Sequence, residues 1–276
     1  MLNRRARLAS PQDLVLVSLL CIYVSNSETT LGLFDGTDLS AHWRVATVER
    51  RTADEWGVLF ESLLGGRTEP SRVDGICLCS TVPAVLPEMR QMIARYFPTA
   101  PTVVVGAGVR TGLPVLVDNP REVGTDRIAN ALAALDLYGA PCIVVGFGLA
   151  TTFDVVNENG EYVGGAIAPG AEVSLAALGD QGAQLRRVEL VRPGSVIAKN
   201  TVEAMQSGAI YGLAGQVDGI VRRMRAELGV AESVLEVVAA GGFAERVLGD
   251  CDTVTRHEPH LTLHGLRLIF VRNQRR

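Results

Sequence analysis

The sequence has no surplus of basic residues and no long run of apolar residues. Its 276 residues include 26 Lys and Arg against 30 Asp and Glu, which leaves a formal charge of −4. Proteins that bind nucleic acid usually carry a basic surplus, so this balance argues against a nucleic-acid partner. The apolar run at residues 14–20 is far shorter than the roughly 20 residues that a helix needs to cross a bilayer. We therefore expect no membrane partner either.

Cysteine pairs with the spacing of a metal site or a disulfide framework are also missing. The five cysteines are an odd number, and Cys77 and Cys79 are separated by one residue, where a zinc knuckle has at least two. Cys21, Cys77, Cys79 and Cys142 lie in apolar runs. We expect buried free thiols in a reducing compartment, and hence a cytoplasmic protein. A signal peptide is the alternative for the N-terminus, but Pro11-Gln12-Asp13 interrupts it and no cleavage site follows promptly.

What the sequence does contain is an alternation of short apolar strands and amphipathic helices, which is typical of an α/β protein. The predicted strands cover residues 14–24, 29–34, 39–47, 75–80, 102–106, 142–148, 150–156 and 234–242. The predicted helices cover residues 52–64, 83–95, 126–137, 200–228 and 261–273. Residues 108–124 contain several glycines and prolines, which predicts a structured loop. The alternating RRVELVR (186–192) is typical of a strand with one solvated face.

Two stretches of the sequence resemble each other. CIYVSNSETTLGLFDG (21–36) and CIVVGFGLATTFDVVN (142–157) share Cys-Ile-x-Val, then small residues, a Thr and a second strand that ends near a turn. This similarity predicts two related α/β halves, each opening with strand–turn–strand, whose turns converge on one ligand. The alternative is that any two buried strands look alike.

Four longer blocks resemble type III pantothenate kinases: PREVGTDRIAN (120–130), EYVGGAIAPG (161–170), residues 183–212 and HLTLHGLRLIF (260–270). The resemblance runs from about residue 18 to residue 273. It implies a duplicated ribonuclease H-like α/β fold of the actin and sugar-kinase superfamily, with two domains and a central cleft. We expect an N-terminal extension at 1–17, a first domain at 18–125 and a second at 126–276. The family implies homodimers that phosphorylate pantothenate, the first step of coenzyme A synthesis, with ATP, Mg²⁺ and K⁺.

The substrate residues that the resemblance implies are all present. The Gly-x-Asp-Arg motif stands here as Gly124-Thr125-Asp126-Arg127. By this resemblance Asp126 is the catalytic base for the substrate hydroxyl, and Arg127 contacts the substrate and fixes its pose. Asn200-Thr201 matches a substrate-contacting pair, with Thr201 as the hydroxyl donor. For Asp126 taken alone, the alternative is a helix N-cap.

The nucleotide segments depart from the family pattern. Asp-x-Gly-Asn-Thr of the family is here Tyr23-Val24-Ser25-Asn26-Ser27, so that Tyr23 replaces the metal-associated carboxylate and Ser25 a close-approach glycine. Asp-Phe-Gly-Thr-Ala-Thr-Thr of the family corresponds here to Gly146, Phe147, Gly148, Leu149, Ala150, Thr151, Thr152. Gly146 replaces the carboxylate for the monovalent cation, and Leu149 replaces a threonine that contacts ATP.

Two milder differences complete the comparison with the family. Thr-Gly-Gly on the adenosine side is Ala240-Gly241-Gly242 here, and Glu28 adds a negative charge beside the expected phosphates.

Loss of one preorganised electrostatic group typically costs about 10²–10³ in the rate of phosphoryl transfer, so a combined loss of roughly 10⁴ is expected even with strong non-additivity. The family's Mg²⁺ and K⁺ ligands are thus replaced, and the sequence identifies no other metal site. His257, His260 and His264 have helical spacing, but Pro259 interrupts the helix.

Three interpretations of this combination remain open. The first is a divergent family member that keeps a pantothenate-like pocket but is impaired in, or repurposed from, Mg-ATP phosphoryl transfer. Such a pseudokinase or tailoring enzyme would act as a homodimer or paired with an intact homologue. The second is a working pantothenate kinase in which Glu28 or Asp154 replaces the missing carboxylates. The third is a structural or interaction module. We expect the first and keep the second as its alternative.

Overall fold

The computed structural model describes residues 18–181 and 188–274, and the predicted extension at 1–17 lies outside them. The chain divides into two compact units: residues up to Val105 together with those from Phe270 form unit 1, and Gly106–Ile269 form unit 2. Along the chain, the division after residue 105 lies about twenty residues before the predicted boundary at 125/126. The loop after residue 106 belongs to unit 2 because Tyr162 exchanges backbone hydrogen bonds with Pro114 and Leu116, each 2.8 Å.

Unit 1 is a five-stranded mixed sheet with two helices. Its strand order is β3 (Asp38–Ala46), β2 (Glu28–Asp35), β1 (Leu19–Val24), β4 (Gly75–Ser80) and β5 (Thr102–Val104). The central strand β1 is apolar almost throughout because it is buried between neighbours on both sides. Helices α1 (Ala53–Leu64) and α2 (Leu86–Tyr96) pack on the sheet through a core that includes Ile22, Trp56 and Met89.

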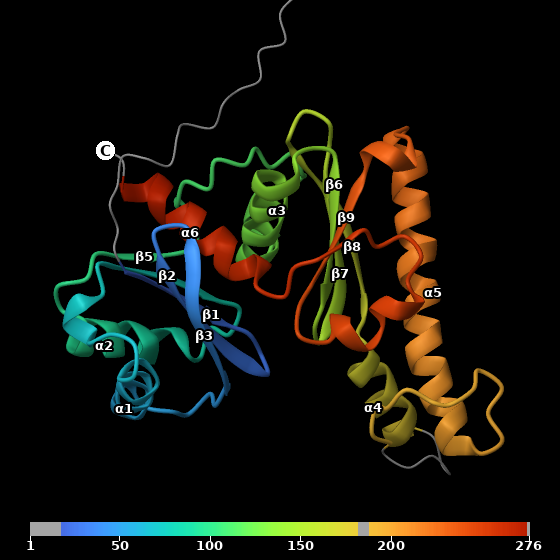
Figure 1. Cartoon of the computed structure of the whole chain (residues 1–276), viewed down its shortest axis with the longest axis horizontal. Helices are drawn as coiled ribbons and strands as arrows, with labels where there is room; N and C mark the ends of the chain where they lie inside the picture. The colour runs from blue at the N-terminus through green and yellow to red at the C-terminus, as the bar shows by residue number, and fades with distance from the viewer. Residues whose placement is uncertain (1–17, 182–187, 275–276) are drawn as a thin grey trace, which may run out of the picture. The chain divides into compact units, whose positions relative to one another are not determined.

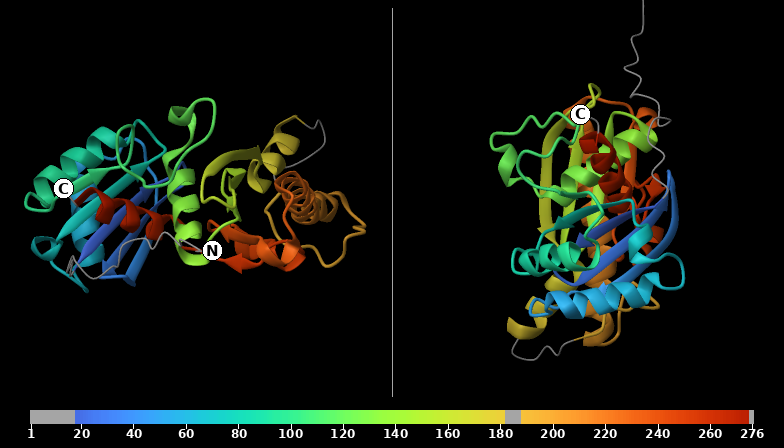
Figure 2. Two further views of the ribbon diagram at one scale, coloured as in Figure 1. Left: turned by 90° about the horizontal axis from the view of Figure 1, so that it is seen from above. Right: turned by 90° about the vertical axis from the view of Figure 1, so that its left-hand side faces the viewer.

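Unit 2 has the same kind of sheet, with the order β10 (Arg256–His257), β9 (Glu236–Ala240), β6 (Cys142–Phe147), β7 (Ala150–Val156) and β8 (Tyr162–Pro169). Its helices are α3 (Thr125–Tyr138), α4 (Ala171–Gln181), α5 (Thr201–Leu228) and most of α6 (Leu261–Gln274). Helix α3 lies on one face of the sheet and the long helix α5 on the other (Figures 1 and 2).

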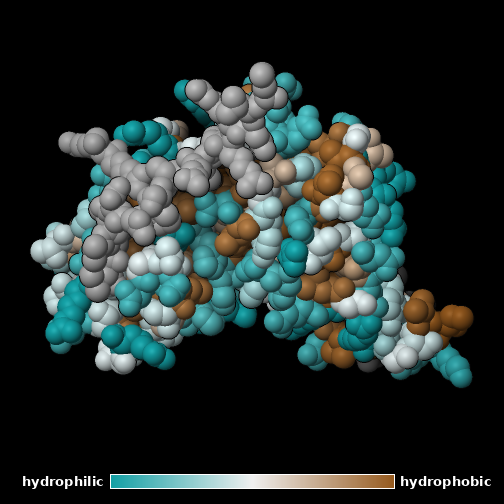
Figure 3. Space-filling model, turned by 45° about the horizontal axis from the view of Figure 1, so that its top comes forward, coloured by the Kyte–Doolittle hydropathy of each residue, from teal (hydrophilic) through white to brown (hydrophobic). Residues whose placement is uncertain are grey.

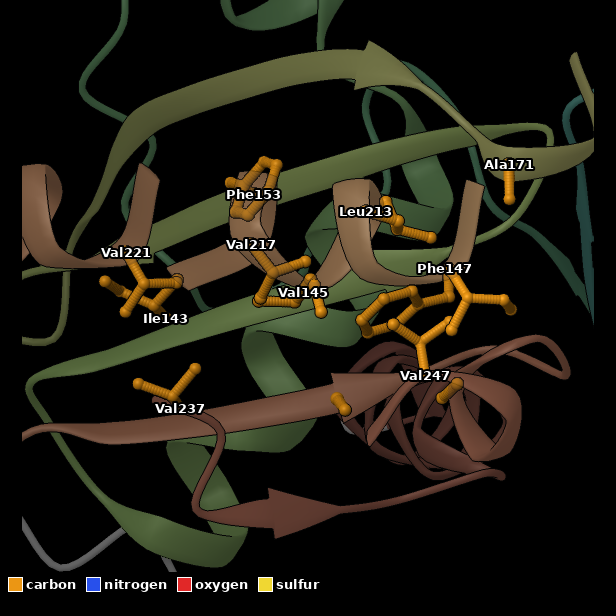
Figure 4. Packing of buried hydrophobic residues seen from close by; sticks show 14 of the residues in the cluster. Ile143, Val145, Phe147, Phe153, Ala171, Leu213, Val217, Val221, Val237 and Val247 are labelled. Carbon is orange, nitrogen blue, oxygen red and sulfur yellow. The ribbon is translucent and has the colours of Figure 1, made fainter. Parts of the chain in front are cut away.

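The core between α5 and the sheet of unit 2 is made of aliphatic and aromatic side chains (Figure 4). Val217 and Val221 of α5 face Ile143 and Val145 of β6, and all four are almost fully buried. Burial at this density contributes roughly 1.5–3 kcal/mol for each large aliphatic side chain relative to its exposed state. The core therefore anchors the strand β6, whose C-terminal end carries the segment Gly146–Leu149.

The pairing patterns of the two sheets confirm the internal duplication. Strand β1 is antiparallel to β2 and parallel to β4, and β6 is likewise antiparallel to β7 and parallel to β9. In both units an antiparallel three-stranded meander is thus extended by parallel strands. The similarity between Cys21 and Cys142 reflects equivalent central strands rather than a chance likeness of two apolar runs.

Several predicted element boundaries were wrong by a few residues. Helix α2 begins at Leu86 instead of residue 83, with Pro87 in its first turn, where a missing N–H costs nothing. Strand β5 ends at Val104, and β9 covers only Glu236–Ala240. Gly241 ends β9 because it has φ = 97°, which no extended strand residue adopts.

The predicted basic strand at 186–192 is wrong where the structure describes it. Residues 188–192 form no strand, and residues 186 and 187 lie outside the described part. Side chains satisfy the backbone here in place of a neighbouring strand: Gln206 donates to the carbonyl of Glu189 at 2.9 Å, and Arg246 to that of Leu190 at 3.3 Å. Alternation of charged and apolar residues indicates that one face of the segment is buried. An irregular segment can bury one face as well, so the pattern alone does not indicate a strand.

The five cysteines are free thiols, as predicted. Cys21, Cys77, Cys79 and Cys142 are buried and Cys251 is half-buried. Burial raises the pKa of Cys142 to about 12, so its reactive thiolate form is scarce near neutral pH. These thiols are packing residues.

Among the described residues, no helix is long and apolar enough to cross a membrane. On the face shown in Figure 3, hydrophobic surface is divided into separate patches among hydrophilic residues.

Buried Asp218 on α5 fastens this helix to the loop after residue 250. Its carboxylate accepts hydrogen bonds from the backbone N–H of Asp252 (3.0 Å) and Thr253 (2.9 Å) and from the Thr253 hydroxyl (2.8 Å). Burial alone would raise the pKa of Asp218, but these hydrogen bonds and the Arg222 charge lower it below its ordinary value. The carboxylate therefore stabilises the folded chain when it is ionised.

We expect Asp218→Asn to destabilise the protein by roughly 2–3 kcal/mol near neutral pH, or about 5–10 °C in the thermal midpoint. Because the folded pKa is lowered, this contribution is fully present above the unfolded pKa of about 3.9 and is lost as pH falls through the folded value. Thermal unfolding from pH 7 to pH 3 measures both effects.

The matched control is Asp252→Asn, which removes the same charge from an exposed carboxylate that pairs with Arg222. Surface ion pairs contribute little, so this variant should lose no more than about 1 kcal/mol. Equal losses in the two variants, or a difference between wild type and Asp218→Asn that persists unchanged at low pH, would contradict the role of Asp218.

Candidate functional site

The first turn of α3 carries the residues predicted to bind the substrate. Gly124 is the N-cap residue and Asp126 lies in the first turn, where free backbone N–H groups favour a negative charge. No side-chain hydrogen bond caps this helix, so the N-cap alternative for Asp126 is wrong. A Cβ atom at position 124 would lie 2.6 Å from Oδ1 of Asp126. Glycine at 124 is therefore what lets the half-buried Asp126 carboxylate occupy its place.

Arg127 follows Asp126 and turns back onto the sheet of unit 2. Its Nε donates to Oδ1 of Asp154 on β7 at 2.8 Å, and the Tyr162 hydroxyl donates to the same oxygen at 2.8 Å. Asp154 has no exposed surface and the Arg127 side chain is 16% exposed. Burial raises the pKa of Asp154, whereas the Arg127 charge and the Tyr162 hydroxyl oppose the rise. The structure thus joins Gly124, Asp126 and Arg127 in one group.

Thr201 is the first residue of α5 and is exposed. The preceding Asn200 is the N-cap: its side chain accepts a hydrogen bond from the backbone N–H of Glu203 at 2.9 Å. Thr201 lines a largely apolar cavity of about 330 Å³ between α4 and α5, together with Ser174, Leu175 and Met205. Within the described residues no hydrogen bond joins Thr201 to the Asp126 group, so its assignment as a substrate contact stays a prediction.

In unit 1 the first predicted nucleotide segment is the turn between β1 and β2. Tyr23 is half-buried on β1, in register with Thr30 and Cys79, while Asn26 and Ser27 are exposed. The Ser25 hydroxyl donates to the carbonyl of Glu28 at 2.8 Å, and the Ser25 backbone N–H donates to the same carbonyl at 2.9 Å. The hydroxyl and the backbone N–H of Ser25 therefore bind within the turn, whereas a phosphate loop would use such donors to bind its ligand.

The charge of Glu28 is compensated within unit 1. Arg44 on β3 donates to both of its carboxylate oxygens, at 3.0 and 2.5 Å. Asp154 is likewise engaged, by Arg127, and has no solvent-exposed surface. Both carboxylates thus have an arginine partner in the structure. That one of them replaces the missing carboxylates stays a prediction.

In unit 2 the second and third nucleotide segments lie against each other. A Cβ atom at Gly241 would lie 2.3 Å from the carbonyl oxygen of Phe147, so only glycine permits this contact. Gly148 and Leu149 are exposed at the tip, Leu149 by 56%, and Gly242 is exposed beside Gly241. Thr151 is 1% exposed, and its hydroxyl has no hydrogen-bond partner among the described residues.

These segments fit the implied nucleotide and metal ions unequally. The glycine at 241 keeps the close backbone packing that a phosphate-binding turn needs. The donor set does not fit Mg²⁺ or K⁺, because Tyr23 and Gly146 supply no carboxylate where the family resemblance implies one. At Gly146 a Cβ atom would lie 2.6 Å from the Thr152 hydroxyl, which occupies the place of the missing side chain. Within the described ranges no group of three or more His, Cys, Asp or Glu side chains could hold a metal ion.

Sequence reasoning missed the support behind Arg127. It considered Asp154 only as a replacement metal ligand and did not single out Tyr162. The available signal was the one charged residue in the strand ATTFDVV, because a buried carboxylate needs a partner. The identity of that partner depends on how α3 lies on the sheet, which no local pattern reveals.

Comparisons with known sequences agree with the resemblance. A family model described as "Type III pantothenate kinase" matches residues 19–223. A protein of that name from Nocardioides sp. is 60% identical over 256 residues, which cover 92% of this chain and 99% of that protein. A Streptomyces griseus protein of the same name is 56% identical over 260 residues, covering 92% of this chain and 98% of that protein.

Comparisons with solved structures bear on the fold alone, since all have low sequence identity. A Baf family protein of Campylobacter jejuni matches with a TM-score of 0.54 and 14% identity, over 92% of this chain and 98% of that one. Component A of (R)-2-hydroxyglutaryl-CoA dehydratase from Acidaminococcus fermentans matches with a TM-score of 0.51 and 14% identity, over 92% and 95%. The predicted duplicated α/β fold with two sheets is confirmed.

Proposed function

Because this chain belongs to the type III pantothenate kinase family, we propose that it transfers the γ-phosphoryl group of ATP to the terminal hydroxyl of pantothenate. One observation supports this most directly: the start of α3 presents Asp126 beside an Arg127 side chain that a buried carboxylate holds. The degree of identity, 60% over nearly all of a named pantothenate kinase, supports the same substrate class.

In this proposal Asp126 accepts the proton of the pantothenate hydroxyl as its oxygen attacks the γ-phosphorus. The bond from that phosphorus to the bridging oxygen breaks, so ADP leaves with the electron pair and 4′-phosphopantothenate forms. Asp126 suits this role because its carboxylate lies in the first turn of a helix and is only half-buried. Arg127 orients the acceptor, and Thr201 is proposed as a further hydroxyl contact.

A second candidate function is supported by the nucleotide segments. Tyr23, Gly146 and Leu149 stand where the family resemblance implies two carboxylates and a hydroxyl, and Glu28 and Asp154 are each paired with an arginine. On this proposal the chain binds a pantothenate-like molecule but transfers phosphate slowly or not at all. It would then act as a pseudokinase, alone or with an intact homologue, or act on a related small molecule.

Separate binding and turnover measurements distinguish the two candidates. Calorimetry gives the affinities for pantothenate and for ATP with Mg²⁺, and mass spectrometry detects 4′-phosphopantothenate. Pantothenate binding together with turnover at ordinary kinase rates, about 1–100 s⁻¹, supports the first proposal. Pantothenate binding without product supports the second. If pantothenate does not bind at all, both are wrong.

Two further parts of the proposal follow from the family. We propose a homodimer in the cytoplasm, in keeping with the buried free thiols. Sedimentation or light scattering of the purified chain, alone and mixed with an intact homologue, tests the homodimer against a mixed dimer.

A further inference from the structure

Strand β7 carries one charged residue in its buried part. Asp154 is 0% exposed and lies between Phe153 and Val155, which belong to the core on the opposite face. Its neighbours in register are Val144 of β6 and Gly165 of β8, so neither residue directly opposite offers it a polar side chain. A buried carboxylate without compensation is strongly unfavourable, and its partner must come from elsewhere in unit 2.

Two donors meet one oxygen of this carboxylate. Arg127 donates from Nε and Tyr162 from its hydroxyl, each at 2.8 Å to Oδ1. The second oxygen, Oδ2, is buried and has no hydrogen-bond partner among the described residues. Tyr162 is itself 1% exposed at the start of β8, so the hydroxyl that braces Asp154 is held in place by the sheet.

Stability alone does not account for this arrangement. A buried ion pair with one carboxylate oxygen left unbonded is often no more stabilising than apolar side chains of similar volume. The arrangement is better explained if its role is to hold the guanidinium in one place. The guanidinium is planar, so holding its Nε edge sets the orientation of the whole group.

The geometry of Arg127 supports that explanation. Of the five N–H donors of a guanidinium, only the Nε–H is used by the pair with Asp154. The described residues accept no other hydrogen bond from this side chain, and 16% of the side chain is exposed. Its Cγ and Cδ atoms would lie 3.5 Å from a Cβ at position 124, so the aliphatic stem passes close to Gly124. The stem and the Nε edge are both fixed, and the four terminal N–H groups remain available.

We infer that Asp154, braced by Tyr162, is the positioning residue that fixes the Arg127 guanidinium, so that its terminal N–H groups face the acceptor beside Asp126. This inference rests on the proposed function, because that function supplies the acceptor. Asp154 acts through Arg127 and does not touch the substrate.

The first test observes the pair directly and needs no ligand. In ¹⁵N-labelled protein, the Arg127 Nε–H resonance, assigned by its loss in Arg127→Lys, should exchange slowly with water. Tyr162→Phe should accelerate this exchange about tenfold, the smallest factor that a hydrogen bond to a charged group is typically worth, and Asp154→Asn should accelerate it further. Asp218→Asn is the control, because it alters another buried carboxylate of unit 2 without contact to Arg127. Rapid exchange in the wild type overturns the inference.

The second test measures the consequence for the substrate. Asp154→Asn should weaken pantothenate binding by about ten- to hundredfold, the usual effect of a small misplacement of an orienting group, and Tyr162→Phe by about fivefold. The dissociation constant for ATP should stay within about twofold. A merely structural role predicts lower stability with unchanged pantothenate affinity, as in Asp218→Asn. If Asp154→Asn fails to fold, Tyr162→Phe decides the outcome.

The two tests separate this inference from the proposed function. If the wild type neither binds nor phosphorylates pantothenate, the proposed function fails, and the exchange measurement still decides whether Asp154 fixes Arg127. If the wild type binds pantothenate and both variants bind it equally well, the inference fails while the proposed function stands.

Discussion

Asp126→Asn is expected to lower the rate of pantothenate phosphorylation by about 10²–10⁴-fold, the usual contribution of a positioned general base. The amide has the shape of the carboxylate but cannot accept the proton that the hydroxyl must lose. Pantothenate should still bind with an affinity within about fivefold of the wild type, because the amide oxygen of the variant still accepts the hydrogen bond from the hydroxyl. Initial rates of 4′-phosphopantothenate formation, with calorimetry for binding, measure both quantities.

Asp118→Asn is the matched control for this prediction. It removes the same charge from an exposed carboxylate of the loop that precedes α3, and it should leave the rate unchanged. If the wild-type rate is too low to follow, the same pair of substitutions is made in the variant described next. A rate in Asp126→Asn above a tenth of its parent's, or an equal loss in Asp118→Asn, would show that Asp126 is not the base.

The combined substitution Tyr23→Asp, Gly146→Asp and Leu149→Thr is expected to raise the phosphorylation rate by about 10²–10⁴-fold and to tighten Mg-ATP binding. The two carboxylates supply the oxygen ligands that Mg²⁺ and K⁺ lack here, and the threonine supplies a hydroxyl donor. Leu149 is 56% exposed, so its replacement removes little from the core. At position 146 the new Cβ requires the Thr152 hydroxyl, 2.6 Å away, to turn aside.

A second triple variant, with side chains of nearly the same shape as the first, separates the effect of the restored charges from that of the changed shape. Tyr23→Asn, Gly146→Asn and Leu149→Val together imitate the restored side chains without their charges or hydroxyl, and should leave rate and nucleotide affinity near those of the wild type. An equal gain in both triple variants would mean that shape, and not charge, limits the present site. No gain in either would mean that these segments do not limit phosphoryl transfer.

Local patterns predicted the elements of the fold with few errors. The apolar run around Cys21 predicts a buried strand because a central strand with parallel and antiparallel neighbours has no solvated face. Thr52 and Glu55 form a capping box at the start of α1, as their spacing indicates. The errors fall at residues 83–85, 105–106 and 188–192 and at both ends of β9. Side-chain hydrogen bonds decide the outcome at 188–192, and the positive φ of Gly241 ends β9.

The candidate site was predictable in part. The Gly124–Arg127 motif is contiguous, so the sequence alone places a carboxylate and a guanidinium together at a helix start. The pairing of Arg127 with Asp154 joins residues 27 positions apart through the packing of α3 on β7. The pairing of Glu28 with Arg44 depends in the same way on the register of β2 and β3. Long-range contacts of this kind follow from packing, which no short window of sequence contains.

By itself the sequence determined the α/β class, its duplication, the free thiols and the family, because each depends on periodicity, composition or contiguous motifs. Tertiary structure alone decided which partner each charged side chain has. Glu28 and Asp154 look like spare carboxylates in the sequence, but one is bound by Arg44 and the other is buried against Arg127 and Tyr162. The physical reason is that the chemistry of a carboxylate depends on its partners and its exposure, and both are set by residues distant in the chain.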